Sequence, residues 1–98
     1  MKSAAVEIVG ILDQVLAIVK RTPQELIWQS RYPDERELVD DLTDHARRIR
    51  QGDLSRLPDL SFLFVPTGPL CEIAASSGWL DAYTVLGNRF DGLHSRLR

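Results

Sequence analysis

The strongest constraint on this chain is the helical periodicity of residues 3–20, for which Ser3 is the expected N-cap. At about 100° per residue, the angular step of an α-helix, its apolar side chains gather on one half of a helical wheel. Only Val6 and Ala17 fall among the polar residues of the other half. The apolar half carries Ala4, Ala5, Ile8, Val9, Ile11, Leu12, Val15, Leu16, Ile18 and Val19. Because an ordinary surface helix has a narrower stripe, we expect this helix to be the most buried element, central to the core or partly covered by another subunit.

Capping signals divide the next stretch of the chain. Residues 22–25 read Thr-Pro-Gln-Glu, a capping box with proline at the first helical position. They predict a short helix through Leu26–Trp28. That helix should end near Arg31, because Tyr32 precedes Pro33 and the residue before a proline disfavours the helical conformation.

Residues 34–50 predict a longer helix. Asp34 is an expected N-cap with Glu37 three residues later, and Gly52 is suited to the left-handed turn after the helix. Acidic residues crowd its start and arginines its end, which complements the helix dipole. Its single apolar stripe comprises Leu38, Val39, Leu42, Ala46 and Ile49.

The segment 53–68 has no clear period. After a turn from Asp53 to Pro58, the apolar run 60–65 is too short for periodicity to separate a strand from a buried helical turn. We favour a helical turn or a packed loop, because a lone strand would have no partner. The apolar side chains expected to order it are Leu60, Phe62 and Phe64.

Two helices are predicted in the C-terminal part. The first begins at Thr67-Gly68-Pro69 and ends at Gly78, with Trp79 packing back. The second carries an apolar seam whose members are spaced by four and three residues in turn, and Trp79 should be a buried anchor at its head. The seam comprises Trp79, Tyr83, Leu86, Phe90, Leu93 and Leu97.

These segments predict an all-α fold, a compact bundle of four to five helices in a single domain, 1–98. A hydrophobic fraction of 44% is sufficient for a core, and a net charge of −2 lacks the basic excess of nucleic-acid binders. With one cysteine, no signal peptide and no apolar run that could span a bilayer, we expect a cytoplasmic protein without membrane association.

No catalytic or metal-binding motif emerges from the reactive side chains. His45 and His94 have no metal-ligand spacing. His45 follows Asp41 by one turn, which favours a half-buried histidine tethered by that carboxylate over one half of a catalytic triad. Cys71 lies in the first turn of its helix between apolar neighbours, which favours a structural role over a reactive thiol. Pro66-Thr67-Gly68-Pro69 lacks the spacing and lysine of a phosphate loop, which favours a helix cap over anion capture by the helix N-terminus. We expect neither cofactor nor metal ion.

An acidic cluster surrounds the start of the 34–50 helix. A solvated surface is the ordinary interpretation of such a face, and a docking surface for a basic partner is the functional one. The candidate binding residues on the outward face are Glu37, Asp40, Asp41 and Asp44. Arg47, Arg48, Arg50 and Arg56 lack interleaved aromatics, so they indicate dipole complementation instead of nucleic-acid binding.

The C-terminal third resembles a bacterial family of small uncharacterised domains. The resemblance rests on Phe64 to Leu70, which read Phe-Val-Pro-Thr-Gly-Pro-Leu, followed by Glu72-Ile73-Ala74 and Gly78-Trp79. It implies a bacterial origin and brings no activity or catalytic residue with it.

Together these patterns favour a non-enzymatic protein-interaction module with another protein, a basic one, as its partner. Homodimer formation is left open. The alternative is a toxin-neutralising immunity-type protein, since such proteins are often small, acidic and without catalytic residues. A third hypothesis is a small hydrolase that uses His45 or Cys71.

Overall fold

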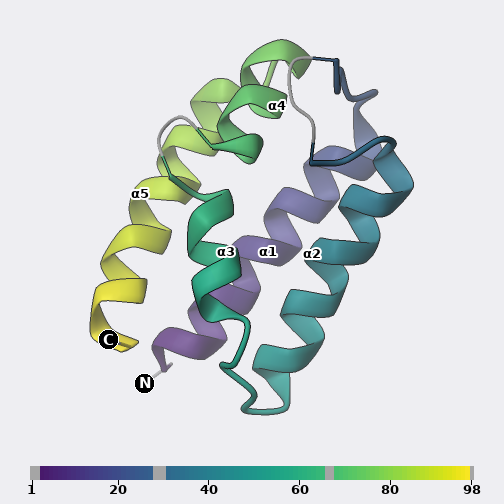
Figure 1. The fold of residues 1–98 in the computed structure, drawn as a ribbon. Coiled ribbons are helices and arrows are strands. Elements are labelled where there is room, and N and C mark those ends of the chain that lie inside the picture. Colours follow the sequence, from purple (N-terminus) through teal and green to yellow (C-terminus); the bar gives the residue numbers. More distant parts are fainter. Residues whose placement is uncertain (1–2, 28–30, 66–67, 98) are drawn as a thin grey trace.

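The computed structural model describes residues 3–27, 31–65 and 68–97, which fold into an all-α bundle. Figure 1 shows the order of its helices, and no strand occurs in these residues. The helices are α1 (Ala4–Arg21), α2 (Glu35–Arg50), α3 (Leu57–Leu63), α4 (Pro69–Ser77) and α5 (Leu80–Leu97). The fold class predicted from the sequence is therefore confirmed.

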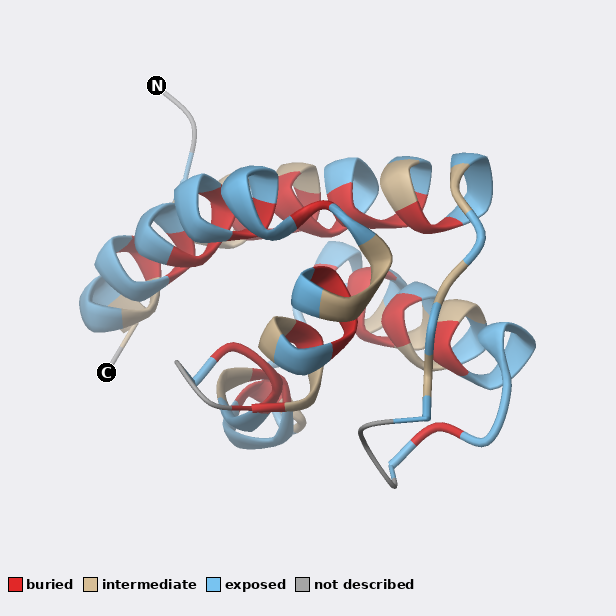
Figure 2. Ribbon diagram, turned by 90° about the horizontal axis from the view of Figure 1, so that it is seen from above, coloured by how far each residue is buried: buried red, intermediate tan, exposed pale blue. Residues whose placement is uncertain are grey.

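Helix α1 lies in the middle of the bundle. It packs against α2 on one side and α5 on the other, and in the view of Figure 1 α3 lies in front of it. The predicted apolar half provides its buried residues, and Ile8, Ile11 and Leu12 have no exposed surface. Val6, outside that half, is 56% exposed. Figure 2 shows the buried turns of the helices facing one another, as hydrophobic burial requires.

Four predicted helix boundaries are confirmed by their caps. The Ser3 hydroxyl accepts from the Val6 N–H at the start of α1, and the Asp34 carboxylate accepts from the Glu37 N–H at the start of α2. Gly52 and Gly78 have φ of 80° and 87°, the left-handed region that favours glycine after a helix. These signals act within a few residues, so the sequence alone displays them.

The helix predicted from the capping box at 22–25 is wrong. Thr22 ends α1 with its N–H on the Ile18 carbonyl, and residues 23–26 are irregular. The backbone N–H of Gln24 donates to Glu35 (2.6 Å), and that of Glu25 donates to the Ser77 hydroxyl (2.8 Å). These tertiary partners replace the local capping bonds that a helix would have needed. Trp28, which the predicted helix would also have contained, lies outside the described residues.

The uncertain segment 53–68 contains the short helix α3, so the helical alternative holds for its centre. Leu60 and Phe64 are buried as predicted, with Phe64 stacked on Phe90 at 4.3 Å between ring centroids. Phe62 is 56% exposed, which contradicts its expected role in the core. In a helix the residues that share a face are three or four apart, and Leu57, Leu60 and Leu63 take the inward positions of α3.

Trp79 joins α4 to α5 and is buried, as predicted. Its N–H donates to the Ala74 carbonyl in the bond that closes a Schellman motif. Its indole Nε1 donates to Gln24 Oε1 at 2.9 Å, and its ring meets Tyr83 edge-on at 6.2 Å. The seam of α5 is buried from Tyr83 to Leu93, with Leu97 partly covered.

Candidate functional site

The four predicted acidic residues of α2 divide into two pairs. Asp41 and Asp44 turn toward α3 and are largely covered, with exposed side-chain fractions of 19% and 26%. Glu37 and Asp40 face outward, and the Asp40 side chain is 71% exposed. The second pair therefore presents its carboxylates on the surface, where Asp40 Oδ2 also lies 3.9 Å from Arg36 Nε in an exposed ion pair.

Arg56, at the start of α3, holds the first pair. Its guanidinium donates to Asp41 Oδ1 at 3.1 Å and to Asp44 Oδ2 at 2.8 Å. Hydrogen bonds from Arg48, Arg47 and Arg56 lower the pKa of Asp44 well below its usual range. The like-charge repulsion between two carboxylates about one turn apart is thus offset within the molecule.

Asp41 also orders the segment that enters α2. The Tyr32 hydroxyl donates to Asp41 Oδ2 at 2.5 Å. Burial, followed by this hydrogen bond, raises the pKa of Tyr32 strongly, so its hydroxyl remains a protonated donor. Asp41 therefore ties residue 32 to α2 and α2 to α3.

His45 lies deeper than the sequence suggested. Its side chain is 1% exposed instead of half-buried. Its Nε2 lies 3.7 Å from Asp41 Oδ1, beyond hydrogen-bond distance, and has no hydrogen-bond partner among the described residues. Burial and the nearby Arg56 charge lower the pKa of His45. A neutral, covered imidazole cannot meet a substrate unless the surrounding helices open.

The outward carboxylates border a hollow on the surface. It has a volume of about 350 Å³ and is lined by Arg31, Tyr32, Glu37, Asp40 and Asp41. Its lining contains three carboxylates and one guanidinium. A cationic side chain would complement this lining.

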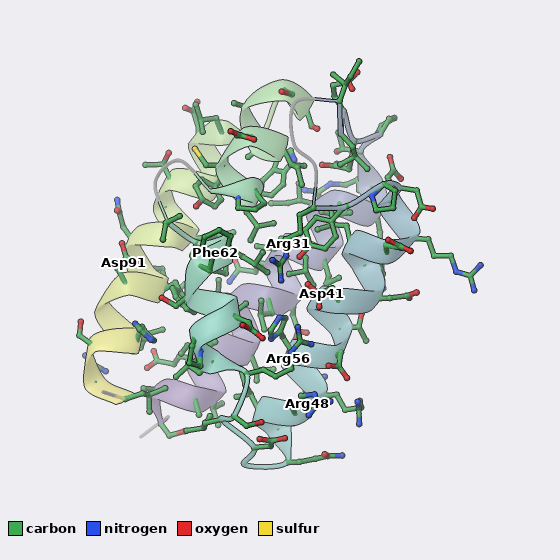
Figure 3. The ribbon with its side chains drawn as sticks, in the orientation of Figure 1. Arg31, Asp41, Arg48, Arg56, Phe62 and Asp91 are labelled. Carbon is green, nitrogen blue, oxygen red and sulfur yellow. The ribbon has the colours of Figure 1, made fainter. Side chains whose placement is uncertain are left out.

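An exposed aromatic ring belongs to the same region. The Arg31 guanidinium carbon lies 5.9 Å from the ring centroids of both Phe62 and Tyr32. Figure 3 shows Arg31 between Phe62 of α3 and Asp41 of α2, with Arg56, at the start of α3, and Arg48 of α2 lower in the view. We call Arg31, Glu37, Asp40 and Phe62 the hollow surface. It combines an apolar ring, a cation and two outward carboxylates.

Sequence reasoning missed most of this arrangement. The sequence patterns predict that Arg56 complements a helix dipole, that a helix ends before Tyr32 and that Phe62 lies in the core. Their contacts with α2 and Arg31 connect segments that the chain separates, and no local pattern encodes them. The exposure of Phe62 could have been inferred had α3 been given a definite helical phase.

Other candidate chemistry is spread over the molecule. Cys71 is half-buried in the first turn of α4, as predicted, and the cavity that it borders does not include His45. In the described ranges, no three His, Cys, Asp or Glu side chains are arranged to hold a metal ion. None of the helices in those ranges has the length and apolar character needed to cross a membrane. Pro66 and Thr67, part of the predicted cap and of the family resemblance, lie outside them.

Comparisons of the chain with family models, with curated proteins and with solved structures gave no match.

Proposed function

We propose that this chain is a non-enzymatic protein-interaction module that docks a basic partner on the hollow surface. The observation that carries the proposal is the exposed Phe62 ring, with Arg31 over it, beside a hollow bordered by Glu37 and Asp40. Aromatic and arginine side chains dominate binding energy at protein interfaces. The adjacent carboxylates specify the sign of the partner's charge.

The partner's chemistry follows from the lining. A lysine or arginine side chain would enter the hollow and meet Glu37 and Asp40, while an apolar neighbour on the partner would cover Phe62. Asp41 and Asp44 already form ion pairs with Arg56 within the chain. We therefore narrow the binding residues proposed from the sequence to Glu37 and Asp40, with Arg31 and Phe62 added.

An immunity-type role is the narrower form of the same proposal. It would apply if the partner is a basic toxin, and the identity of the partner decides between the two. The partner is to be captured from the native host on the immobilised chain, identified by mass spectrometry and purified.

Matched variants then test the surface. Glu37→Lys changes an exposed residue in the first turn of α2, and Asp81→Lys makes the same reversal in the first turn of α5. At low salt we expect Glu37→Lys to slow association by about tenfold, since steering accelerates encounter by at least that much. Asp81→Lys should leave the rate unchanged. Equal association rates for the two variants would show that the charge of Glu37 does not steer the partner.

The aromatic contribution has its own pair of variants. Phe62→Ala and Val85→Ala each truncate an exposed apolar residue, 56% and 61% accessible respectively. We expect Phe62→Ala to raise the Kd by about tenfold or more, chiefly through faster dissociation. Val85→Ala, on α5, should leave the Kd unchanged. A partner that tolerates both Phe62→Ala and Glu37→Lys docks elsewhere, and the proposal then fails.

A further inference from the structure

A second cavity lies on the other side of the bundle, between the end of α3, the start of α4 and one face of α5. Its volume is about 160 Å³. In Figure 3 its residue Asp91 lies on α5, away from α2. The lining residues are Phe64, Cys71, Tyr83, Thr84, Gly87, Asn88 and Asp91. The cavity shares none of them with the hollow surface.

The floor of this cavity is apolar and buried. The rings of Phe64 and Tyr83 lie nearly parallel, with an interplanar angle of 11° and centroids 6.1 Å apart. Gly87 leaves the floor open, since a Cβ at that position would meet only the Tyr83 ring, at 3.7 Å or more. A cavity of about 150 Å³ is large enough for a benzene ring, so the floor suits a flat apolar group.

The rim of the cavity is polar and has one sign of charge. Thr84, Asn88 and Asp91 are exposed there, and the Asp91 carboxylate makes no ion pair within the described part of the chain. No lysine or arginine is among the lining residues. A ligand at this rim would therefore gain from a positive charge and lose from a negative one.

We propose that this cavity binds a small organic cation, an amine carried on a single aromatic ring. The ring rests on Phe64 and Tyr83 over Gly87, and the ammonium group donates to Asp91 and to the Asn88 side-chain oxygen. The small volume, buried floor and polar rim suit a free small molecule. An apolar lining with a few polar groups at its edge is also the composition of larger ligand sites.

Benzylamine, benzyl alcohol and benzoate test the proposal, because they share one ring and differ in charge. A titration followed by ¹H–¹⁵N NMR should give a Kd on the order of 1 mM for benzylamine, given its few heavy atoms. Benzyl alcohol should bind about fivefold more weakly, because its hydrogen bond is not charge-assisted. Benzoate should not bind, and the shifted amides should lie on the 83–91 face of α5.

Variants separate this site from nonspecific binding. Asp91→Asn should remove the preference for benzylamine over benzyl alcohol, while Asp81→Asn, also exposed on α5, should retain it. Gly87→Val should block all three compounds by filling the floor. If that variant fails to fold, the comparison of the two exposed aspartates still decides the matter.

Cys71 provides a second measurement, since it is the chain's one cysteine and borders the cavity. Benzylamine at saturation should slow its alkylation by iodoacetamide at least about threefold, in line with its occupancy of the cavity. Equal affinity for the three compounds, equal behaviour of Asp91→Asn and Asp81→Asn, or unprotected Cys71 at saturation would each overturn the proposal.

Discussion

Trp79 is the residue whose removal should damage the fold most clearly. It is buried at the junction of α4 and α5, contacts Tyr83 edge-on, and donates its indole N–H to Gln24. Trp79→Ala removes the ring and leaves the Gln24 oxygen without its donor. Truncation of a large core aromatic costs about 3–5 kcal/mol. Of this, about 1 kcal/mol belongs to the hydrogen bond.

Trp79→Phe separates the two contributions. It retains an aromatic ring against Tyr83 and removes the donor to Gln24, so the free energy of unfolding should fall by about 1–2 kcal/mol. Both variants are to be measured by urea denaturation and far-UV circular dichroism, which does not depend on the removed indole. A small domain is stable by about 5–15 kcal/mol, so the alanine variant should lose a large share of it. A loss below about 1 kcal/mol for Trp79→Ala would refute the assignment of Trp79 as an anchor.

Three further predictions concern stability. Gly78→Ala places a side chain at φ 87° and should lower the free energy of unfolding by about 1–2 kcal/mol. Gly10→Ala, inside α1 with open space around its Cβ, should raise that free energy by about 0.5–1 kcal/mol. Changes of the same sign for the two variants in urea denaturation would contradict these expectations. For His45, burial lowers the folded-state pKa below the ordinary 6.5, so the unfolded chain binds a proton that the folded chain does not. The free energy of unfolding should therefore decrease as the pH falls below about 6.5, and in the His45→Leu variant it should decrease less steeply. The same dependence on pH in both proteins would count against a neutral buried imidazole. Arg56→Gln leaves Asp41 and Asp44 facing each other without their shared cation, so its thermal midpoint should fall more than that of Arg36→Gln, whose guanidinium is 89% exposed.

The parts of the fold that the sequence predicted are those that local chemistry determines. Ser3, Asp34, Gly52 and Gly78 act within one helical turn of their own positions. The wide apolar half of α1 is likewise visible in sequence order, and it correctly indicated a central helix. Predictions of this kind need no knowledge of which segments meet in space.

The errors arise where distant segments compete with local signals. Gln24 bonds to residues 11 and 55 positions away, and Glu25 to one 52 positions away, so a sound capping box did not form a helix. The candidate site shows the same limit. Asp41 and Asp44 were correctly placed on α2, but the partner that they share, Arg56, reaches them from the start of α3. A charge pattern alone cannot show which carboxylates are already neutralised.

The central claim is that a basic partner docks on the hollow surface. The most direct measurement is hydrogen–deuterium exchange of the chain alone and in complex with its purified partner. Exchange into amides reports protection along the backbone, so it locates the covered region without any substitution. We expect slower exchange in the complex around residues 31–40 and at the end of α3 near Phe62, with exchange in α5 unchanged. Protection confined to α5 or to α4, with residues 31–40 exchanging as in the free chain, would contradict it.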